Sequence, residues 1–322
     1  MDRRQFLQST AAAGLAAATP WACARGPERR AGEPVPRRAL GRTGLDLPII
    51  GFPGLVVAGM EQEQADRTVA RAYERGIDYF DVAPTYRDAE DRLGPALAPY
   101  RRKSFLACKT TQRLAAGAED ELDASLRKLR TDHFDLYQLH AIRTADDIEQ
   151  AFGPGGAMEA FVKARDAGKV RFLGFSAHSV EAALAAMARF AFDTTLFPVN
   201  YVAWWRGDFG PQVVAEAQRQ GMGILTLKAL CRQRWPEGAE RHHEPCWYEP
   251  VVDPEEARLA LSFSLSQNAT AAIPPANEEL FWLAADLAGQ VGPLAGEEEA
   301  RLRELAAGFR PIFSYPAWRD DT

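Results

Sequence analysis

Cysteine is scarce in this chain of 322 residues, and its positions exclude one large class of folds. The four cysteines are Cys23, Cys108, Cys231 and Cys246, and the first of them falls in an N-terminal leader, which leaves an odd number behind it. Small domains that are held together by disulfides carry many more cysteines at close spacing. The fold must therefore be stabilised by a hydrophobic core, and a hydrophobic content of 47% is sufficient for one.

Excess positive charge and long apolar runs are also absent. The formal net charge is −6, so the chain offers no basic stripe that could pair with phosphate groups. No run reaches the roughly 20 apolar residues that a transmembrane helix needs. These absences argue against nucleic acid and anionic membrane surfaces as partners, and against a membrane span. They favour a small-molecule substrate.

The first 24 residues have the pattern of a cleaved export signal. A charged start with Arg3 and Arg4 is followed by the short, mildly apolar run Ala11–Ala18 and by the small residues of Ala22–Ala24. This order of regions is typical of a signal peptide, and the arginine pair resembles signals of the twin-arginine (Tat) type. Residues 1–24 are therefore predicted to engage the Tat export machinery and to direct the protein to the periplasm. Because such systems carry folded proteins, a cofactor bound before export is expected.

Two other interpretations of the leader remain open. Residues 1–24 could be an uncleaved basic N-terminus, or Cys23 could be lipidated and anchor the protein. The segment Pro20–Ala22 before this cysteine is a poor match to a lipoprotein signal. Export without a lipid anchor is the favoured interpretation.

Residues 25–36, rich in proline, glycine and charge, are predicted to form a linker, and residues 37–322 a single domain. In this domain short apolar runs alternate with amphipathic stretches of helical period, as in βαβ units around a parallel sheet. Eight such pairs predict a (β/α)8 TIM barrel. A hairpin over Arg38–Leu47 is expected to cap the N-terminal end of the barrel, and Gly296–Gly308 is expected to add one helix. The predicted strands are Pro48–Gly51, Ile77–Asp81, Ser104–Cys108, Phe134–Leu139, Val170–Phe175, Thr195–Asn200, Gly223–Leu227 and Thr270–Ile273. The predicted helices between them are Gln62–Arg75, Ala89–Leu97, Glu119–Leu129, Gly156–Ala167, Val180–Phe190, Pro211–Gln220, Pro254–Gln267 and Asn277–Gly289.

Polar side chains follow the second, third and fourth predicted strands. Asp81, Lys109 and His140 each close an apolar run, and Tyr86 comes five residues after Asp81. Taken singly, each residue could have a purely structural role, as a helix cap, a surface lysine, a core histidine or a loop tyrosine. Active sites of barrels lie at the C-terminal ends of the strands, so the four are expected to converge on one place. A phenol with an intrinsic pKa of about 10 exchanges protons poorly near neutrality, and a neighbouring ammonium that is held by a carboxylate would lower that pKa.

These residues lie in a stretch that resembles the aldo/keto reductase family. The most specific segment is Gly76–Tyr86, which reads Gly-Ile-Asp-Tyr-Phe-Asp-Val-Ala-Pro-Thr-Tyr, and the resemblance runs from residues 38–45 to residues 272–275. It implies a hydride transfer between a nicotinamide cofactor and a carbonyl or alcohol group. In the roles that the family implies, Tyr86 is the general acid, Lys109 lowers its pKa, Asp81 pairs with Lys109, and His140 orients the carbonyl.

The resemblance is weaker where NAD(P)(H) would bind. The family holds the nicotinamide carboxamide with a Ser-Asn pair and a glutamine, whereas this chain has Ser176 followed by alanine, and Leu196. At the adenosine end, residues 273–279 contain no lysine or arginine for a 2′-phosphate but contain Glu278 and Glu279, so the choice between NAD and NADP stays open. Lys228 is a plausible phosphate partner by its charge. The expected cofactor-binding residues are Gly54, Leu55, Asp81, Ser176, Leu227, Lys228, Leu230, Pro274 and Asn277.

The longest irregular segment, Ala229–Val252, is too long for an ordinary connection and is expected to be functional. Cys231 and Cys246 could pair in a disulfide, and with His242 and His243 they are soft-metal ligand types, but no known ligand spacing is present. A lid or substrate-facing role is favoured, and no metal site is predicted. An aromatic surface against which a sugar or ring of the substrate stacks could be formed by Trp204, Trp205, Trp235 and Trp247. The alternative is that these tryptophans pack in the core.

Two further functions compete with a reductase that acts on an aldehyde, ketone or sugar-like alcohol. One is a barrel that binds a cofactor without turnover. The other is a redox-neutral enzyme that retains its nucleotide, because the compartment to which the protein is exported has no pool of free nicotinamide nucleotides. The set Asp81, Tyr86, Lys109 and His140 favours the reductase, since a binding protein has no need of these four residues together.

Overall fold

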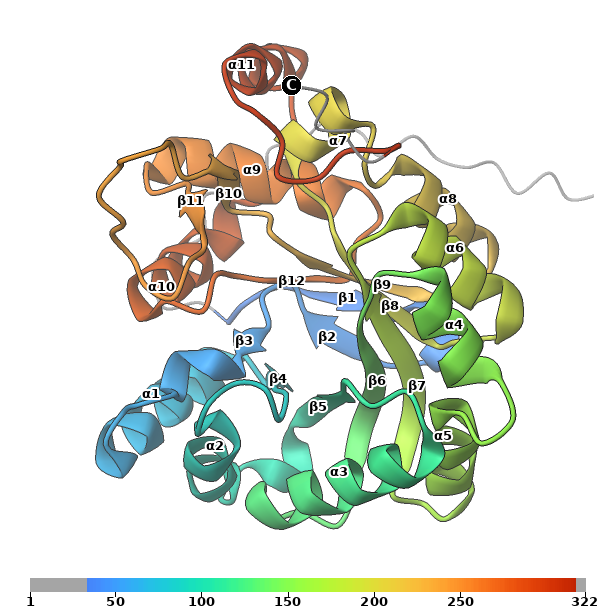
Figure 1. Ribbon diagram of the computed structural model, residues 1–322. Helices are drawn as coiled ribbons and strands as arrows, with labels where there is room; N and C mark the ends of the chain where they lie inside the picture. The colour runs from blue at the N-terminus through green and yellow to red at the C-terminus, as the bar shows by residue number, and fades with distance from the viewer. Residues whose placement is uncertain (1–33, 317–322) are drawn as a thin grey trace, which may run out of the picture.

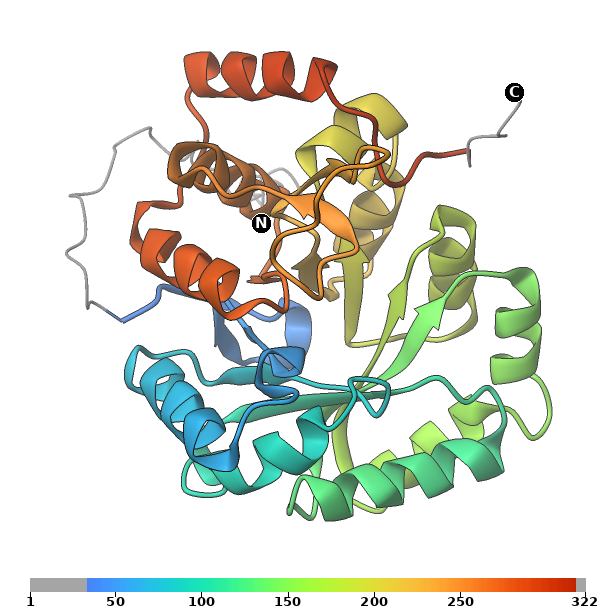
Figure 2. The ribbon, with the colours of Figure 1, turned by 60° about the vertical axis from the view of Figure 1, so that its left-hand side comes forward.

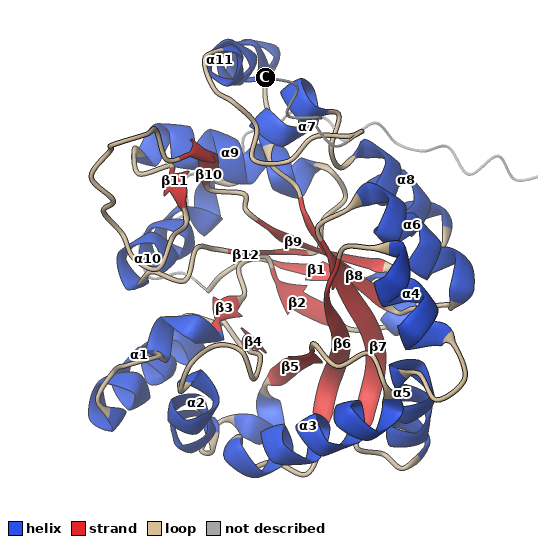
Figure 3. Ribbon diagram, viewed as in Figure 1, coloured by secondary structure: helices blue, strands red, loops and turns tan. Residues whose placement is uncertain are grey.

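The structure is a computed structural model, and it describes residues 34–316. The predicted signal segment 1–24 and residues 25–33 of the predicted linker lie outside the described residues. The described chain forms a barrel of strands surrounded by helices (Figures 1 and 3). Within residues 34–316 no helix combines the length and the apolar character that crossing a membrane requires.

The barrel is an eight-stranded sheet with the order β12-β9-β8-β7-β6-β5-β4-β3, and all neighbouring strands are parallel. Its two end strands are brought together where Ile50 forms an isolated parallel bridge with Ala272. This confirms the predicted (β/α)8 fold. The strands are β3 (Phe52–Pro53), β4 (Tyr79–Asp81), β5 (Phe105–Thr110), β6 (Phe134–Ile142), β7 (Val170–Ala177), β8 (Thr194–Pro198), β9 (Gly223–Leu227) and β12 (Ala271–Ile273).

The helices surround the sheet because each presents an apolar stripe to it. In α1, for example, the buried residues Ala65, Thr68, Val69 and Ala72 recur at helical spacing. The helices are α1 (Gln62–Glu74), α2 (Ala89–Leu97), α3 (Ala115–Lys128), α4 (Ala145–Phe152), α5 (Ala157–Asp166), α6 (Val180–Arg189), α7 (Tyr201–Gly207), α8 (Pro211–Arg219), α9 (Pro254–Ser266), α10 (Glu278–Leu287) and α11 (Gly296–Ala307). Short 3-10 turns are η1 (Gly41–Thr43), η2 (Gly54–Val57), η3 (Arg101–Lys103) and η4 (Ala288–Gln290).

The N-terminal end of the barrel is closed by the hairpin of β1 (Arg37–Ala39) and β2 (Asp46–Pro48), as the sequence predicts. Leu40 and Leu47 from this hairpin pack against barrel-facing side chains such as Tyr79 and Leu225. Gly41 lies so close to the backbone of β9 that a Cβ atom there would stand 2.2 Å from the amide nitrogen of Gly223. With this end filled, the open end is the one where the strands finish.

Three features differ from the predicted elements. Of the strand expected over Pro48–Gly51, Pro48 ends the hairpin and the next residues meet β12 only through the isolated bridge of Ile50 with Ala272. The strand that pairs with β4 is Phe52–Pro53, because one apolar run continues through both segments and does not mark the boundary. Two helices, α4 and α7, lie in segments that were not expected to be helical. The segment 229–252 contains a hairpin of β10 (Cys231–Arg234) and β11 (Tyr248–Pro250).

The extra helix α11, which the sequence predicts, lies outside the ring of helices, beside α7 and α9 (Figure 2).

Candidate active site

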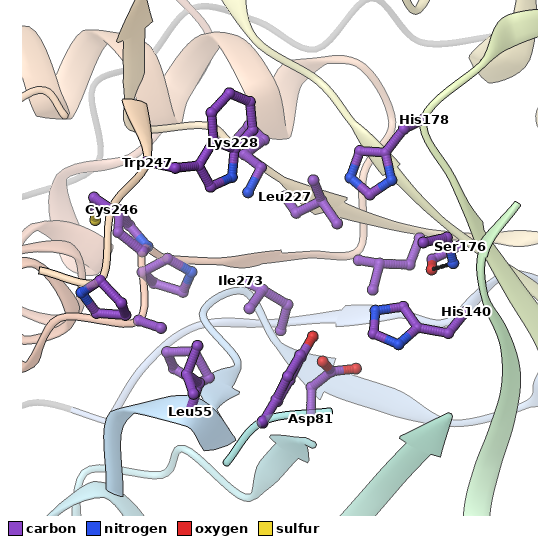
Figure 4. A pocket seen from close by; sticks show the side chains of 18 of the residues that line it. Leu55, Asp81, His140, Ser176, His178, Leu227, Lys228, Cys246, Trp247 and Ile273 are labelled. Atoms are coloured by element: carbon purple, nitrogen blue, oxygen red, sulfur yellow. Dashed lines mark hydrogen bonds between the residues drawn. The ribbon is translucent and has the colours of Figure 1, made fainter. Parts of the chain in front are cut away.

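A cavity of about 650 Å³ opens at the C-terminal ends of the strands (Figure 4). Its position follows from the alternation of side chains along each strand, which sends every second residue into the barrel. In β4 and β5 this alternation places Asp81 and Lys109 above the packed residues Tyr79 and Ala107. Nine of the residues predicted to be catalytic or cofactor-binding line the cavity, and they are Leu55, Asp81, Tyr86, Lys109, His140, Ser176, Leu227, Lys228 and Pro274.

Lys109 and Asp81 form a buried ion pair between neighbouring strands. The Lys109 ammonium also donates to the carbonyl oxygen of Val82 at 3.1 Å. The second carboxylate oxygen of Asp81 accepts from the Gln138 amide at 3.3 Å and from the Tyr79 hydroxyl at 3.4 Å. Burial alone would lower the pKa of Lys109, but the charge of the Asp81 carboxylate and its hydrogen bond to the ammonium raise that pKa above its usual value. The ammonium is therefore charged across the physiological range.

The hydroxyl of Tyr86 lies 3.4 Å from the ammonium of Lys109, and its ring meets that of His140 edge to face at 5.8 Å. The sequence predicted that Lys109 lowers the pKa of Tyr86. In the structure the removal of Tyr86 from water raises its pKa, and the opposing effect of Lys109 offsets this only in part. Tyr86 is therefore a protonated phenol at neutral pH, as a proton donor must be.

His140 projects from the end of β6 beside Tyr86. Burial, followed by the positive charge of Lys109, lowers its pKa to about 3, so the imidazole is neutral at physiological pH. The Arg113 guanidinium holds the backbone here by donating to the carbonyl oxygen of His140 at 2.8 Å. Among the described residues, Nδ1 of His140 has no hydrogen-bond partner. A neutral imidazole can donate one hydrogen bond to a substrate oxygen.

The wall beyond these four residues is apolar on one side and cationic on another. Leu196, Leu227 and Ile273 supply its apolar part. Lys228, which has a positive φ of 69°, lies 4.8 Å from the ring centre of Tyr248, and burial lowers its pKa. The hydroxyl of Ser176 accepts from the backbone N–H of Ala141 at 2.8 Å, which ties the end of β7 to the end of β6.

A second, smaller cavity of about 160 Å³ adjoins the first and shares Leu55, Pro245 and Ala276 with it. Asn277 and Glu278 line it, but the side chain of Asn277 already caps α10 by accepting from the backbone N–H of Leu280 at 3.2 Å. Arg87 also lines this cavity. Residues 273–279 contain no lysine or arginine, so this cation cannot be predicted from the neighbours along the chain.

Gly54 and Leu230 do not line either cavity. Leu230 is fully buried in the core. Gly54 packs against β4 so closely that a Cβ atom would stand 2.9 Å from the carbonyl oxygen of Asp81. Both residues therefore pack in the protein interior and do not contribute to the surface of either cavity.

The segment 229–252 covers one side of the cavity, which agrees with the expected lid or substrate-facing role. Cys246, Trp247 and Tyr248 line the cavity wall, whereas Trp204, Trp205 and Trp235 do not. Cys231 and Cys246 are both free thiols. No group of three or more histidine, cysteine or acidic side chains within residues 34–316 is placed to hold a metal ion. His178 and Phe313, which the sequence did not assign to the site, also line the cavity.

Comparisons with known proteins agree with this architecture. A family model described as the aldo/keto reductase family matches residues 51–275, and a model of the twin-arginine translocation signal matches residues 1–20. The chain resembles an uncharacterized oxidoreductase of Bacillus subtilis, YqkF, with 31% identity over 44% of this chain and 48% of that protein. It resembles L-galactose dehydrogenase of Arabidopsis thaliana with 30% identity over 43% of this chain and 47% of that protein. Each match thus spans about half of the relative's length.

Solved structures share the fold. The holo form of an aldo-keto reductase from Bacillus halodurans superimposes with a TM-score of 0.65 at 22% identity, covering 84% of this chain and 96% of that one. The family model alone spans well over half of the chain. The chain therefore belongs to the aldo/keto reductase family of oxidoreductases and begins with a twin-arginine translocation signal sequence.

Proposed function

We propose that this protein transfers hydride between NAD(P)(H) and the carbonyl or alcohol carbon of a small substrate, with Tyr86 as the proton donor. The observation that supports this most directly is the convergence of Tyr86, Lys109, Asp81 and His140 on one cavity at the C-terminal ends of the strands. A phenol, an ammonium held by a carboxylate, and a neutral imidazole form a complete set for protonating a carbonyl oxygen.

The residues present fit a nicotinamide dinucleotide. Two adjoining cavities that share three wall residues form an elongated space, as a dinucleotide requires. Leu227 and Ile273 offer an apolar surface for the nicotinamide ring, Ser176 a hydroxyl for its carboxamide, and Lys228 a cation for the pyrophosphate. When bound, the cofactor supplies or accepts the hydride.

The remaining chemistry belongs to side chains of this chain. Tyr86 gives its proton to the carbonyl oxygen as that oxygen gains negative charge, and the Lys109 ammonium stabilises the phenolate left behind. Asp81 keeps Lys109 charged and in place. His140 donates a hydrogen bond to the same oxygen, and its low pKa prevents it from replacing Tyr86 as the acid. In the reverse direction the Tyr86 phenolate accepts the proton of an alcohol.

The adenosine end leads to a prediction about the nucleotide. We expect NADH to bind at least as tightly as NADPH, because Glu244 and Glu278 line the second cavity and their negative charge disfavours a 2′-phosphate there. Arg87 is the one opposing cation among the described residues there. Titrations followed by intrinsic tryptophan fluorescence at one salt concentration measure the two affinities. Glu278→Lys should favour NADPH, and Arg87→Ala should weaken NADPH more than NADH.

Tenfold tighter binding of NADPH to the unaltered protein, which is about 1.4 kcal/mol, would contradict this view of the adenosine end. If neither nucleotide binds but one is released when the purified protein is denatured, its absorbance and mass would identify it. That result would favour the redox-neutral enzyme with a retained nucleotide over the reductase.

We further propose that the leader exports the folded protein to the periplasm, as its match to the twin-arginine signal suggests. Replacing Arg3 and Arg4 together by lysine should retain the protein in the cytoplasm, because the pair is read by an export receptor. Immunoblots of periplasmic and cytoplasmic fractions measure the distribution, and tryptic resistance of the retained protein serves as the control for folding. Unchanged export of the double variant would mean that another route is used.

A further inference from the structure

We propose that the substrate carries a carboxylate, which binds to the guanidinium of Arg143 on the β6 and β7 side of the cavity. This inference rests on the proposed function, because it names the class of carbonyl compound or alcohol on which the reductase acts. It follows from the distribution of charge in the cavity wall, from the partners of Arg143, and from the space that the cofactor leaves free.

The cavity wall is cationic although the protein as a whole is acidic. Its charged residues are the cations Lys109, Arg143 and Lys228 and the single acid Asp81. Asp81 is already neutralised by Lys109, so Arg143 and Lys228 remain uncompensated within the wall. The whole chain has a formal net charge of −6. A positive cavity in a negative protein attracts an anionic ligand.

Arg143 has no ion-pair partner within residues 34–316. Of the two acids that follow it closely, Asp146 and Asp147, the second is committed elsewhere, because its Oδ1 accepts from the guanidinium of Arg113 at 2.8 Å. Its Oδ2 accepts from the backbone N–H groups of Arg143 at 2.9 Å and Thr144 at 3.0 Å. The backbone of Arg143 is therefore fixed by Asp147 while its guanidinium is free to bind a ligand.

The cavity has two sides, and the adenosine end of the cofactor is expected on only one of them. His140, Ser176 and His178 form one side in Figure 4, and Leu55 and Cys246 lie opposite. Leu55 also lines the second cavity, so the second cavity lies on the latter side, where it matches the adenosine of the proposed cofactor. Arg143 follows His140 by three residues at the end of β6 and is left for the substrate.

The surroundings of Arg143 add a polar group and an apolar surface. His178 lines the cavity beside it, and its buried Nδ1 has no hydrogen-bond partner among the described residues. Burial, followed by the charges of Lys228 and Arg143, lowers the pKa of His178 to about 3, so the positive charge near this neutral imidazole comes from Lys228 and Arg143. Phe313 packs 5.5 Å from His178, and Trp247, which is 47% exposed, extends this wall. A guanidinium binds a carboxylate through two parallel hydrogen bonds, and the aromatic wall would contact the body of the same molecule.

Matched pairs of aldehydes provide the test. The first pair is 4-carboxybenzaldehyde and benzaldehyde, and the second is 4-oxobutanoate and butanal; the members of each pair share the carbonyl and differ in the carboxylate. We expect kcat/KM to be at least tenfold higher for the carboxylated members. Arg143→Met should remove most of this advantage, mainly through KM, with less than a twofold change for the uncharged aldehydes and for nucleotide affinity. Arg143→Lys should restore part of it, because a single charge remains without the planar fork.

Arg102→Met is the matched control, since it makes the same change of net charge on an exposed residue. Arg102 belongs to η3, which precedes β5 and so lies at the opposite end of the barrel. It should leave both substrate classes within twofold of wild type. Binding of 4-carboxybenzyl alcohol and benzyl alcohol, measured by calorimetry without turnover, gives a second readout. In Arg143→Met the affinity for 4-carboxybenzyl alcohol should fall tenfold or more, and the affinity for benzyl alcohol should not.

The two proposals can fail separately. If charged and uncharged aldehydes are reduced equally well and Arg143→Met changes neither, the carboxylate site is wrong and the reductase stands. If the carboxylated alcohol binds in a manner that depends on Arg143 but no carbonyl is reduced, the carboxylate site stands and the reductase is wrong. Absent or Arg143-independent binding of the carboxylated alcohol overturns the inference, as does a tenfold loss of nucleotide affinity in Arg143→Met.

Discussion

Turnover of Tyr86→Phe is expected to fall by a factor on the order of 10² or more, with nucleotide affinity nearly unchanged. The substitution removes one hydroxyl, which contacts the ammonium of Lys109 at 3.4 Å and is the proposed proton donor. The ring can keep its edge-to-face contact with His140, so the cavity should retain its shape. Because the pKa of His140 is lowered to about 3, this residue carries no spare proton to replace the phenol at neutral pH. Steady-state kinetics and nucleotide titrations measure the two quantities.

Tyr201→Phe is the control for this experiment. Tyr201 is a buried tyrosine of α7 whose hydroxyl donates to Glu256 at 2.9 Å, and it does not line the cavity. Its replacement deletes the same atom from a site without proposed chemistry, so turnover should stay within a few-fold of wild type. Turnover of Tyr86→Phe within twofold of wild type would rule out Tyr86 as the proton donor.

The barrel and the convergence of its polar residues could be predicted because both depend on regular elements. Asp81, Lys109 and His140 end strands, and parallel strands in a barrel finish at the same face. The period of two along each strand decides that these side chains point inward. A short motif then adds Tyr86, which the turn after β4 brings back over the cavity.

Other parts of the site depend on loops, and local sequence does not determine their paths. Arg87 and Lys228 both adopt positive φ, which non-glycine residues rarely do, and this conformation is maintained by the surrounding packing. The availability of Arg143 cannot be predicted from the sequence, because it depends on Arg113 occupying Asp147 from another loop. The neighbouring Lys109 predicts a lowered pKa for Tyr86, whereas the burial of Tyr86 has the larger effect and raises that pKa. Such effects require the folded structure.

Asp81→Asn is expected to lower the free energy of unfolding by about 3–5 kcal/mol, because it leaves the buried ammonium of Lys109 without its counter-ion. The remaining partners of Lys109 are neutral, namely the carbonyl oxygen of Val82 and the hydroxyl of Tyr86. Urea unfolding followed by circular dichroism measures the change. Asp78→Asn is the control, since Asp78 pairs with the exposed Arg37 at 2.8 Å and should contribute less than about 1 kcal/mol.

A double variant separates the structural role of this ion pair from its chemical role. Removing one partner leaves a buried charge unpaired, whereas removing both partners leaves none. The variant that combines Asp81→Asn with Lys109→Met should therefore be more stable than Asp81→Asn alone. Activity should behave differently, because in the double variant Tyr86 has lost the ammonium that stabilises its phenolate. We therefore expect the double variant to regain stability without regaining turnover. Equal stability of Asp81→Asn and Asp78→Asn would show that Lys109 tolerates the loss of its partner, and recovered turnover in the double variant would mean that the pair serves only the fold.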